Sequence, residues 1–166
     1  MYQLTYDELR EAVIEVSPNG VEKVISDDFP SKPVYSPDGL HSAYIAPLEW
    51  EEPGKLYVYN LKNGENKLCI TPDEQNNIPK YAQWLNNDIL LVIIGFGDGT
   101  VSIGGNIFAY SLLDGTLRSI TNYPSNIQVT KIKVVADDII LTGIEYIDDT
   151  MNEFRDFKEK INKVEL

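Results

Sequence analysis

The sequence has almost none of the residues that form disulfide bonds or bind structural zinc. Its 166 residues include one cysteine, Cys69, and one histidine, His41. An intramolecular disulfide needs two cysteines, and structural zinc sites need clusters of Cys and His ligands. A disulfide framework and a zinc-finger type of site are therefore excluded, and we expect no cofactor and no metal centre.

Basic residues are also few. Fourteen Lys and Arg residues stand against 26 Asp and Glu residues, which gives a formal net charge of −12 at pH 7. Nucleic-acid backbones and anionic membranes attract clustered basic side chains. No apolar run approaches the roughly 20 residues that a membrane-spanning helix needs. We therefore expect neither a nucleic-acid partner nor membrane insertion.

The beginning of the chain lacks the basic and then apolar segments of a secretory signal. As it stands, the sequence predicts a cytoplasmic protein. The alternative is an exported or cell-surface lipoprotein whose leader has been removed. The length fits one domain over residues 1–166, and 43% hydrophobic residues are enough for a packed core.

The sequence does contain a repeated phrase of strand, turn and strand. Residues 56–64 are LYVYNLKNG and residues 107–115 are IFAYSLLDG, an offset of 51 positions (115 − 64). Each phrase has the alternating side-chain pattern of a β-strand. It ends in Asn-Gly or Asp-Gly, which favours a tight hairpin turn. A fainter copy covers residues 12–20. Each copy predicts a hairpin.

Further strand pairs precede the two strong copies, and one more pair ends near residue 146. In chain order this gives a half-unit, two full four-stranded units and a half-unit over residues 12–146, or about three units in total. Four strands that recur every 40 to 50 residues or so are typical of β-propeller blades. We predict an all-β fold of antiparallel, propeller-like repeats.

The two ends carry helix signals instead. Residues 150–153 (TMNE) form a capping-box pattern, and apolar side chains from Phe154 to Val164 recur at helical spacing. This predicts an amphipathic C-terminal helix over residues 150–163. A weaker capping box predicts a short helical turn within residues 1–11.

Three blades are too few for a standard ring, since propellers have four to eight. Three alternatives remain for how the exposed strand edges are covered. Two chains can complete each other as a six-bladed dimer, one chain can close a cramped three-bladed body, or the C-terminal helix can cover the open edge.

The longer loops are predicted to lie on one face of the repeats, which is where function concentrates on a rigid scaffold. In one of them Trp50 is flanked by Glu49, Glu51 and Glu52, and in another Asp98 lies among glycines. An aromatic ring among carboxylates can anchor a basic peptide or a cationic ligand. The plain alternative is that Trp50 folds back over an outer strand while the carboxylates face water.

No catalytic motif is complete. Residues 100–104 (TVSIG) lack the first glycine of a nucleophile elbow, and no helix pattern follows them. His41, the only histidine, lies beside a turn on the opposite predicted face from Ser102. We therefore expect no catalytic residue and no enzyme activity.

The turn Ser36-Pro-Asp-Gly39, with residues 43–46, 56–61 and 64–71, looks like the WD40-like repeat of TolB-type β-propellers. The same repeat occurs in the propellers of prolyl-oligopeptidase-like enzymes. The chain is also similar to small uncharacterised bacterial domain families with propeller-like repeats, in which residues 99–105 would be a family feature. The resemblance implies a scaffold that binds proteins or covers an active site. It carries over no catalytic residue, because no hydrolase domain is present.

Two hypotheses for function follow. The first is a non-enzymatic β-repeat scaffold that binds a protein partner through its acidic long-loop face. The second is a carbohydrate- or cation-binding module, or a degenerate glycosidase, that uses Trp50 and the nearby carboxylates.

Overall fold

A computed structural model describes residues 1–166 and consists of fourteen strands and one short 3-10 helix, η1 (Lys163–Glu165). The strands form four antiparallel sheets, each built from consecutive strands. Sheet I contains β1 (Gln3–Asp7), β2 (Ala12–Val16) and β3 (Glu22–Ser26); sheet II contains β4 (Val34–Tyr35), β5 (His41–Ala46), β6 (Lys55–Asn60) and β7 (Glu65–Ile70). Sheet III contains β8 (Asn77–Trp84), β9 (Ile89–Phe96), β10 (Asn106–Ser111) and β11 (Leu117–Ser119); sheet IV contains β12 (Ile127–Val135), β13 (Asp138–Tyr146) and β14 (Phe154–Asn162).

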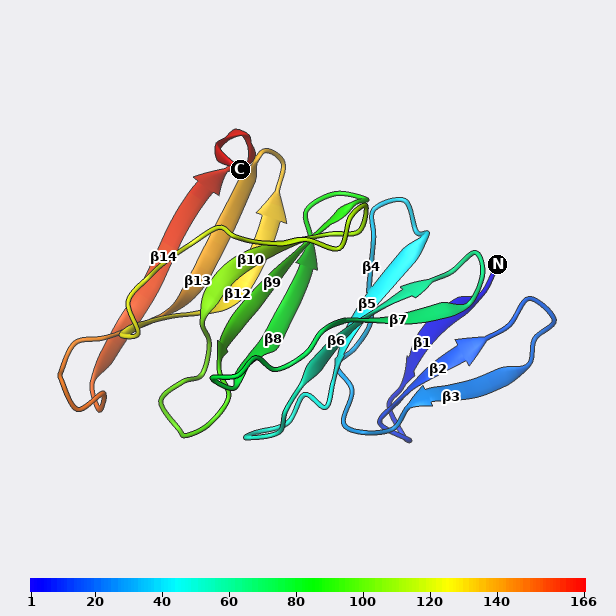
Figure 1. Cartoon of the computed structure of the whole chain (residues 1–166), viewed down its shortest axis with the longest axis horizontal. Helices are drawn as coiled ribbons and strands as arrows, with labels where there is room; N and C mark the ends of the chain where they lie inside the picture. Colours follow the sequence, from blue (N-terminus) through cyan, green and yellow to red (C-terminus); the bar gives the residue numbers. More distant parts are fainter.

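The four sheets follow one another in a row, with sheet I and sheet IV at opposite ends of the long axis (Figure 1). The two strong repeats form the predicted hairpins, β6–β7 and β10–β11. Their turn glycines, Gly64 and Gly115, have φ values of 77° and 72°, which residues with a side chain rarely adopt. The all-β, propeller-like part of the prediction therefore agrees with the structure.

The predicted C-terminal helix is wrong. Residues 154–162 form β14, which pairs with β13 over nine residues. Phe157 and Ile161 lie on one face of this strand and pack in the core beside sheet III, so the free edge of β13 decided the conformation over local helix propensity. The supposed capping box is a turn in which the Asp148 carboxylate accepts hydrogen bonds from the backbone N–H groups of Asn152 and Glu153.

The predicted N-terminal helical turn is also wrong. Residues 3–7 form β1, which pairs with β2. Each end of the chain therefore carries a three-stranded sheet in place of a two-stranded half-unit. The chain has four sheets and not three blades, and a pair of copies would have eight sheets. A C-terminal helix that covers an open edge does not exist.

Three cores lie between successive sheets. In β5, Tyr44 and Ala46 face sheet I, whereas Ala43 and Ile45 face sheet III. In β9, Leu90 and Val92 face sheet II, whereas Leu91 and Ile93 face sheet IV. Successive side chains of a strand point to opposite faces. The apolar runs in β5 and β9 therefore exist because each inner sheet is packed on both faces.

Glycines allow sheets III and IV to approach closely where the β9–β10 loop meets β12. Gly105 forms an isolated bridge with Val129. A Cβ atom on Gly104 would lie 2.1 Å from the carbonyl oxygen of Val129, and one on Gly95 would lie 1.9 Å from the carbonyl oxygen of Gly104. Only glycine permits backbones this close.

Candidate functional site

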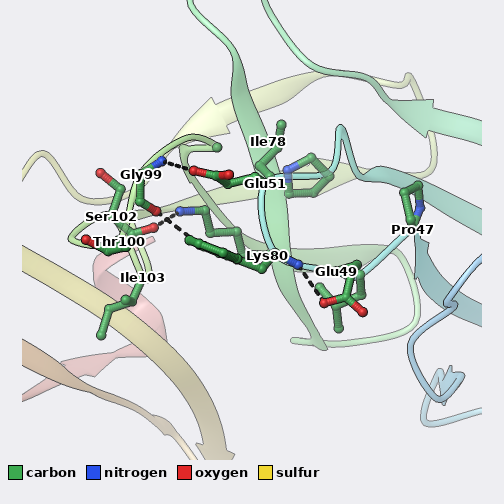
Figure 2. A pocket seen from close by; sticks show the side chains of 13 residues that line it. Pro47, Glu49, Glu51, Ile78, Lys80, Gly99, Thr100, Ser102 and Ile103 are labelled. Carbon is green, nitrogen blue, oxygen red and sulfur yellow. Dashed lines mark hydrogen bonds between the residues drawn. The ribbon is translucent and has the colours of Figure 1, made fainter.

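A cavity of about 360 Å³ lies between the loop that joins β5 to β6 and the loop that joins β9 to β10. We call it the loop pocket. Both loops lie at the same edge of the row of sheets (Figure 1). The loop pocket is lined by residues 47–51 of the first loop, by Ile78, Pro79 and Lys80 of β8, and by Gly97, Gly99, Thr100, Ser102 and Ile103 of the second loop. Figure 2 shows these side chains.

Trp50 stands at this pocket with 65% of its surface exposed. Its indole Nε1 donates a hydrogen bond to the carbonyl oxygen of Gly99 at 3.2 Å. The backbone N–H of Gly99 in turn donates to Oε1 of Glu51 at 3.1 Å (Figure 2). These two bonds join the loops of sheets II and III, so the exposed indole is held in place by the neighbouring loop.

The five residues that the sequence singled out are only partly brought together. Trp50, Glu49 and Glu51 line the loop pocket, whereas Glu52 is exposed outside it. Asp98 lies between two lining glycines, and its Oδ2 accepts a hydrogen bond from Nδ2 of Asn76 at 2.9 Å. Glu49 Oε1 accepts a bond from the backbone N–H of Trp50 at 3.0 Å. The molecule contains no group of three His, Cys, Asp or Glu side chains that could hold a metal ion.

Lys80 is the pocket residue that sequence reasoning missed. Its ammonium donates hydrogen bonds to three carbonyl oxygens, those of Phe96 (2.6 Å), Ser102 (2.5 Å) and Gly104 (3.0 Å). No carboxylate pairs with it. Burial lowers the pKa of Lys80 from 10.5 to about 8, because desolvation disfavours the charged form.

The three bonds of Lys80 tie β8 to both ends of the β9–β10 loop. Lys80 lies at a β-bulge, where the pairing of β8 with β9 shifts between Pro79 and Tyr81. In the sequence it is a single lysine in a strand, with no neighbour that marks it. Only the folded loop supplies the carbonyl groups that receive it.

The pocket brings together groups that can bind a cation. An exposed indole face and two carboxylates lie at one site, and each carboxylate uses one oxygen in the bonds described above. Such a set attracts a cation. Ser102 also lines this pocket, but His41 lines a different cavity together with Cys69 and Tyr110. The structure therefore does not bring Ser102 and His41 together as nucleophile and base.

Several solved structures have a related fold. A candidate conserved lipoprotein from Clostridium novyi NT is 28% identical, with 80% of this chain and 86% of that chain covered and a TM-score of 0.74. The β-propeller domain of the trilobed protease from Pyrococcus furiosus, described as having an open velcro topology, is 16% identical, with 96% and 52% covered and a TM-score of 0.56. Oligopeptidase B from Leishmania major is 10% identical, with 98% and 23% covered and a TM-score of 0.60.

The chain thus spans about half of the trilobed protease domain and about a quarter of oligopeptidase B. At these identities the two likenesses concern the fold alone, and they support the propeller-like part of the resemblance. Membership of the WD40-like repeat family is not supported. No curated protein matches the chain. None of its helical structure has the length and hydrophobicity to cross a membrane.

A family model covers most of the chain, from residue 21 to residue 163. This range begins just before β3 and ends just after β14, so it includes sheets II, III and IV and the whole loop pocket. The chain therefore belongs to the DUF4652 family, a domain of unknown function.

Proposed function

We propose that this chain is a non-catalytic, propeller-like binding module whose loop pocket receives a basic side chain of a protein partner. The observation that carries the proposal is Trp50, which is 65% exposed although its indole N–H is anchored on Gly99. A large aromatic ring held rigidly at the surface loses little conformational entropy on binding, and such residues dominate the energy of many interfaces.

The charges around the ring favour a cationic ligand. A Lys or Arg side chain over an indole face gains roughly 0.5–2 kcal/mol, depending on how far it is desolvated. Glu49 and Glu51 lie beside the indole as counter-charges. The net charge of −12 also steers basic partners toward the molecule. The one cation of the pocket, Lys80, already donates to three carbonyl groups.

A peptide display library tests this proposal. Selection against the immobilised protein is expected to enrich sequences that share an Arg or Lys at one position. Binding of the best peptide, followed by isothermal titration calorimetry, is expected to weaken at least about tenfold in Trp50→Ala and in the double variant Glu49→Gln/Glu51→Gln. Glu52→Gln is the matched control, because Glu52 is exposed outside the pocket.

Two results would contradict the proposal. The selected peptides could lack a shared basic residue, or their binding could survive Trp50→Ala unchanged.

The second candidate function is carbohydrate binding, which the exposed indole also favours because sugar rings stack on aromatic faces. A glycan array in which signals disappear with Trp50→Ala would favour it over the peptide ligand.

We also propose that the module works outside the cytoplasm. The support is the 28% identity to the C. novyi protein, which is described as a candidate conserved lipoprotein. Protease treatment of intact cells that express the full natural gene with a C-terminal tag checks this. Loss of the tagged domain from intact cells is expected, and its protection until the cells are lysed would contradict export.

A further inference from the structure

Sheet IV packs one face on sheet III and leaves the other face without a partner. Its inner face carries Ile132, Leu141 and Phe157, which belong to the core shared with sheet III. Side chains one position along a strand point to the opposite face. Four exposed lysines occupy such positions on the outer face: Lys131 and Lys133 of β12, and Lys158 and Lys160 of β14.

The strand register gathers these lysines around the central strand, β13. One lysine of β12 and one of β14 flank Thr142, and the other two flank Ile140 in the same way. Neighbouring strands are about 4.8 Å apart, so four of the chain's 14 basic residues share a small area. The acids of this face are Asp138, whose Oδ2 lies 3.9 Å from Nζ of Lys160, and Asp156. The outer face of sheet IV is therefore basic in a strongly acidic protein.

Sheet I has the opposite character on its own outer face. Leu4 and Val13 point into the core shared with sheet II. The alternate positions of the three strands therefore face outward, among them Asp7, Ile14, Glu22 and Val24. Arg10 lies between Asp7 and Glu22. Its Nε is 3.4 Å from Oδ2 of Asp7, and its Nη1 is 4.0 Å from Oε2 of Glu22. Glu8 and Glu11 of the β1–β2 turn are also exposed, and Oε1 of Glu8 lies 2.8 Å from Nζ of Lys32.

Each outer face also has accessible apolar surface among its charges. On sheet I, Val24 is 46% exposed, whereas Ile14 beside it is only 4% exposed. Ile140 of sheet IV is half-buried between its two lysines. Inside the molecule, sheets I and II, II and III, and III and IV all pack face to face on apolar side chains.

We propose that a second copy of this chain supplies one more contact of this kind, with the basic outer face of sheet IV of one copy docked on the acidic outer face of sheet I of the other. The two faces lie at opposite ends of the row of sheets (Figure 1), so a two-fold pair makes the contact twice and closes a ring of eight sheets. The chain spans 52% of the trilobed protease propeller domain. Two copies therefore provide about the length of one whole propeller. This inference is independent of the ligand of the loop pocket.

Complementary charge reversal tests the contact. Sedimentation velocity of the wild-type chain at micromolar concentrations in low salt is expected to show a dimer. Lys158→Glu/Lys160→Glu and Asp7→Lys/Glu22→Lys should each dissociate at least about tenfold more readily. A mixture of the two variants should restore a dimer, because one contact pairs the two reversed faces and the other pairs two unchanged faces. Lys62→Glu/Lys67→Glu, reversed elsewhere on the surface, is the control that should remain a dimer.

Thermal unfolding of each variant establishes that it is folded before its mass is interpreted. A wild-type chain that stays monomeric at 100 μM or so would overturn the proposal. So would a dimer that both reversals leave intact, or a mixture of folded variants that fails to reassociate. Species that grow beyond the dimer with concentration would overturn the closed ring.

Discussion

The inner sheets and sheet IV differ in how many of their faces are buried. Strands at the centre of sheets II and III are mostly apolar, and residues 42–46 of β5 and 90–93 of β9 are buried on both faces. The central strand of sheet IV, β13, is buried on one side, while Ile140 and Ile144 on the other side are half-buried. The end sheets also have three strands each, and the inner sheets have four. Sheet IV therefore leaves one face free, whereas the inner sheets are packed on both faces.

The same comparison separates two kinds of surface. The loop pocket belongs to the inner sheets, where loops from sheets II and III are fixed on each other by the Trp50–Gly99–Glu51 bonds. The end sheets carry charged side chains on their outer faces, mostly lysines on sheet IV and mostly carboxylates on sheet I. The first arrangement suits a small group that enters a cavity, and the second suits another sheet.

The largest loss of stability is expected when a large core side chain is removed from an inner sheet. Leu91 of β9 is completely buried, so Leu91→Ala is expected to lower the free energy of unfolding by about 3 kcal/mol. Ile140→Ala on the open face of sheet IV should lower it by less than about 1 kcal/mol in the monomer. Urea denaturation measures both, and equal losses would contradict the difference between inner and end sheets.

A second prediction concerns the close approach of sheets III and IV. Gly104→Ala places a Cβ atom 2.1 Å from the carbonyl oxygen of Val129, so the backbones must separate, at a cost of about 2–3 kcal/mol. Gly99→Ala has open space but a φ of 81°, and should cost only about 1 kcal/mol. If both variants unfold at the same urea concentration, the contact between the loop and β12 is not tight.

A third prediction concerns the half-buried ammonium of Lys80 in sheet III. The pKa of Lys80 is about 8 in the folded protein and near 10.5 in the unfolded chain, so the unfolded chain binds more protons between these values. Stability of the wild type relative to Lys80→Met should therefore rise as the pH increases from 8 to 10.5. Because the ammonium is partly exposed, we expect a rise on the order of 1 kcal/mol.

Urea denaturation of both proteins across that pH range gives this difference directly. The comparison with Lys80→Met removes the contribution of the tyrosines, several of which have a pKa raised by burial. A difference that is flat with pH would contradict the buried state of the Lys80 ammonium. Lys62→Met, which removes an exposed lysine and keeps Lys80, is the matched control and should retain the pH dependence of the wild type.

The smallest effect is expected at the boundary between sheets I and II. Nζ of Lys32 lies 2.8 Å from Oε1 of Glu8, but these side chains are 70% and 71% exposed. Water screens such a pair. Lys32→Ala should leave the urea midpoint unchanged within error, and a clear loss would mean that ion pairs, and not only the apolar core, hold the end sheet in place.

Local patterns predicted part of this fold. The Asn-Gly and Asp-Gly turns and the alternation beside them correctly indicated the hairpins β6–β7 and β10–β11. They failed at the two ends, where capping boxes and helical spacing predicted helices over residues that form β1 and β14. Both errors have the same cause. The open edges of β2 and β13 offer backbone hydrogen bonds to the terminal segments, and a pattern within one segment contains no information about a free edge.

The candidate site was predicted in part for a similar reason. An indole among glutamates in a long loop is visible in the sequence, and Trp50, Glu49 and Glu51 do line one pocket. Lys80 was missed because its partners are backbone carbonyl groups of another loop, which have no signature in side-chain composition. The four lysines of sheet IV lie in two distant pairs in the sequence, and the pairing of β12 and β14 on either side of β13 brings the two pairs together.

By itself, the sequence determined that the chain is an acidic β protein without disulfides, built from hairpins that repeat, because turn preferences and alternation act over a few residues. Only the tertiary structure decided that there are four sheets, that β14 is a strand, and which side chains meet at the loop pocket and on the outer faces. These features depend on strand pairing and face-to-face packing between distant segments. Their energies come from neighbours that local sequence does not specify.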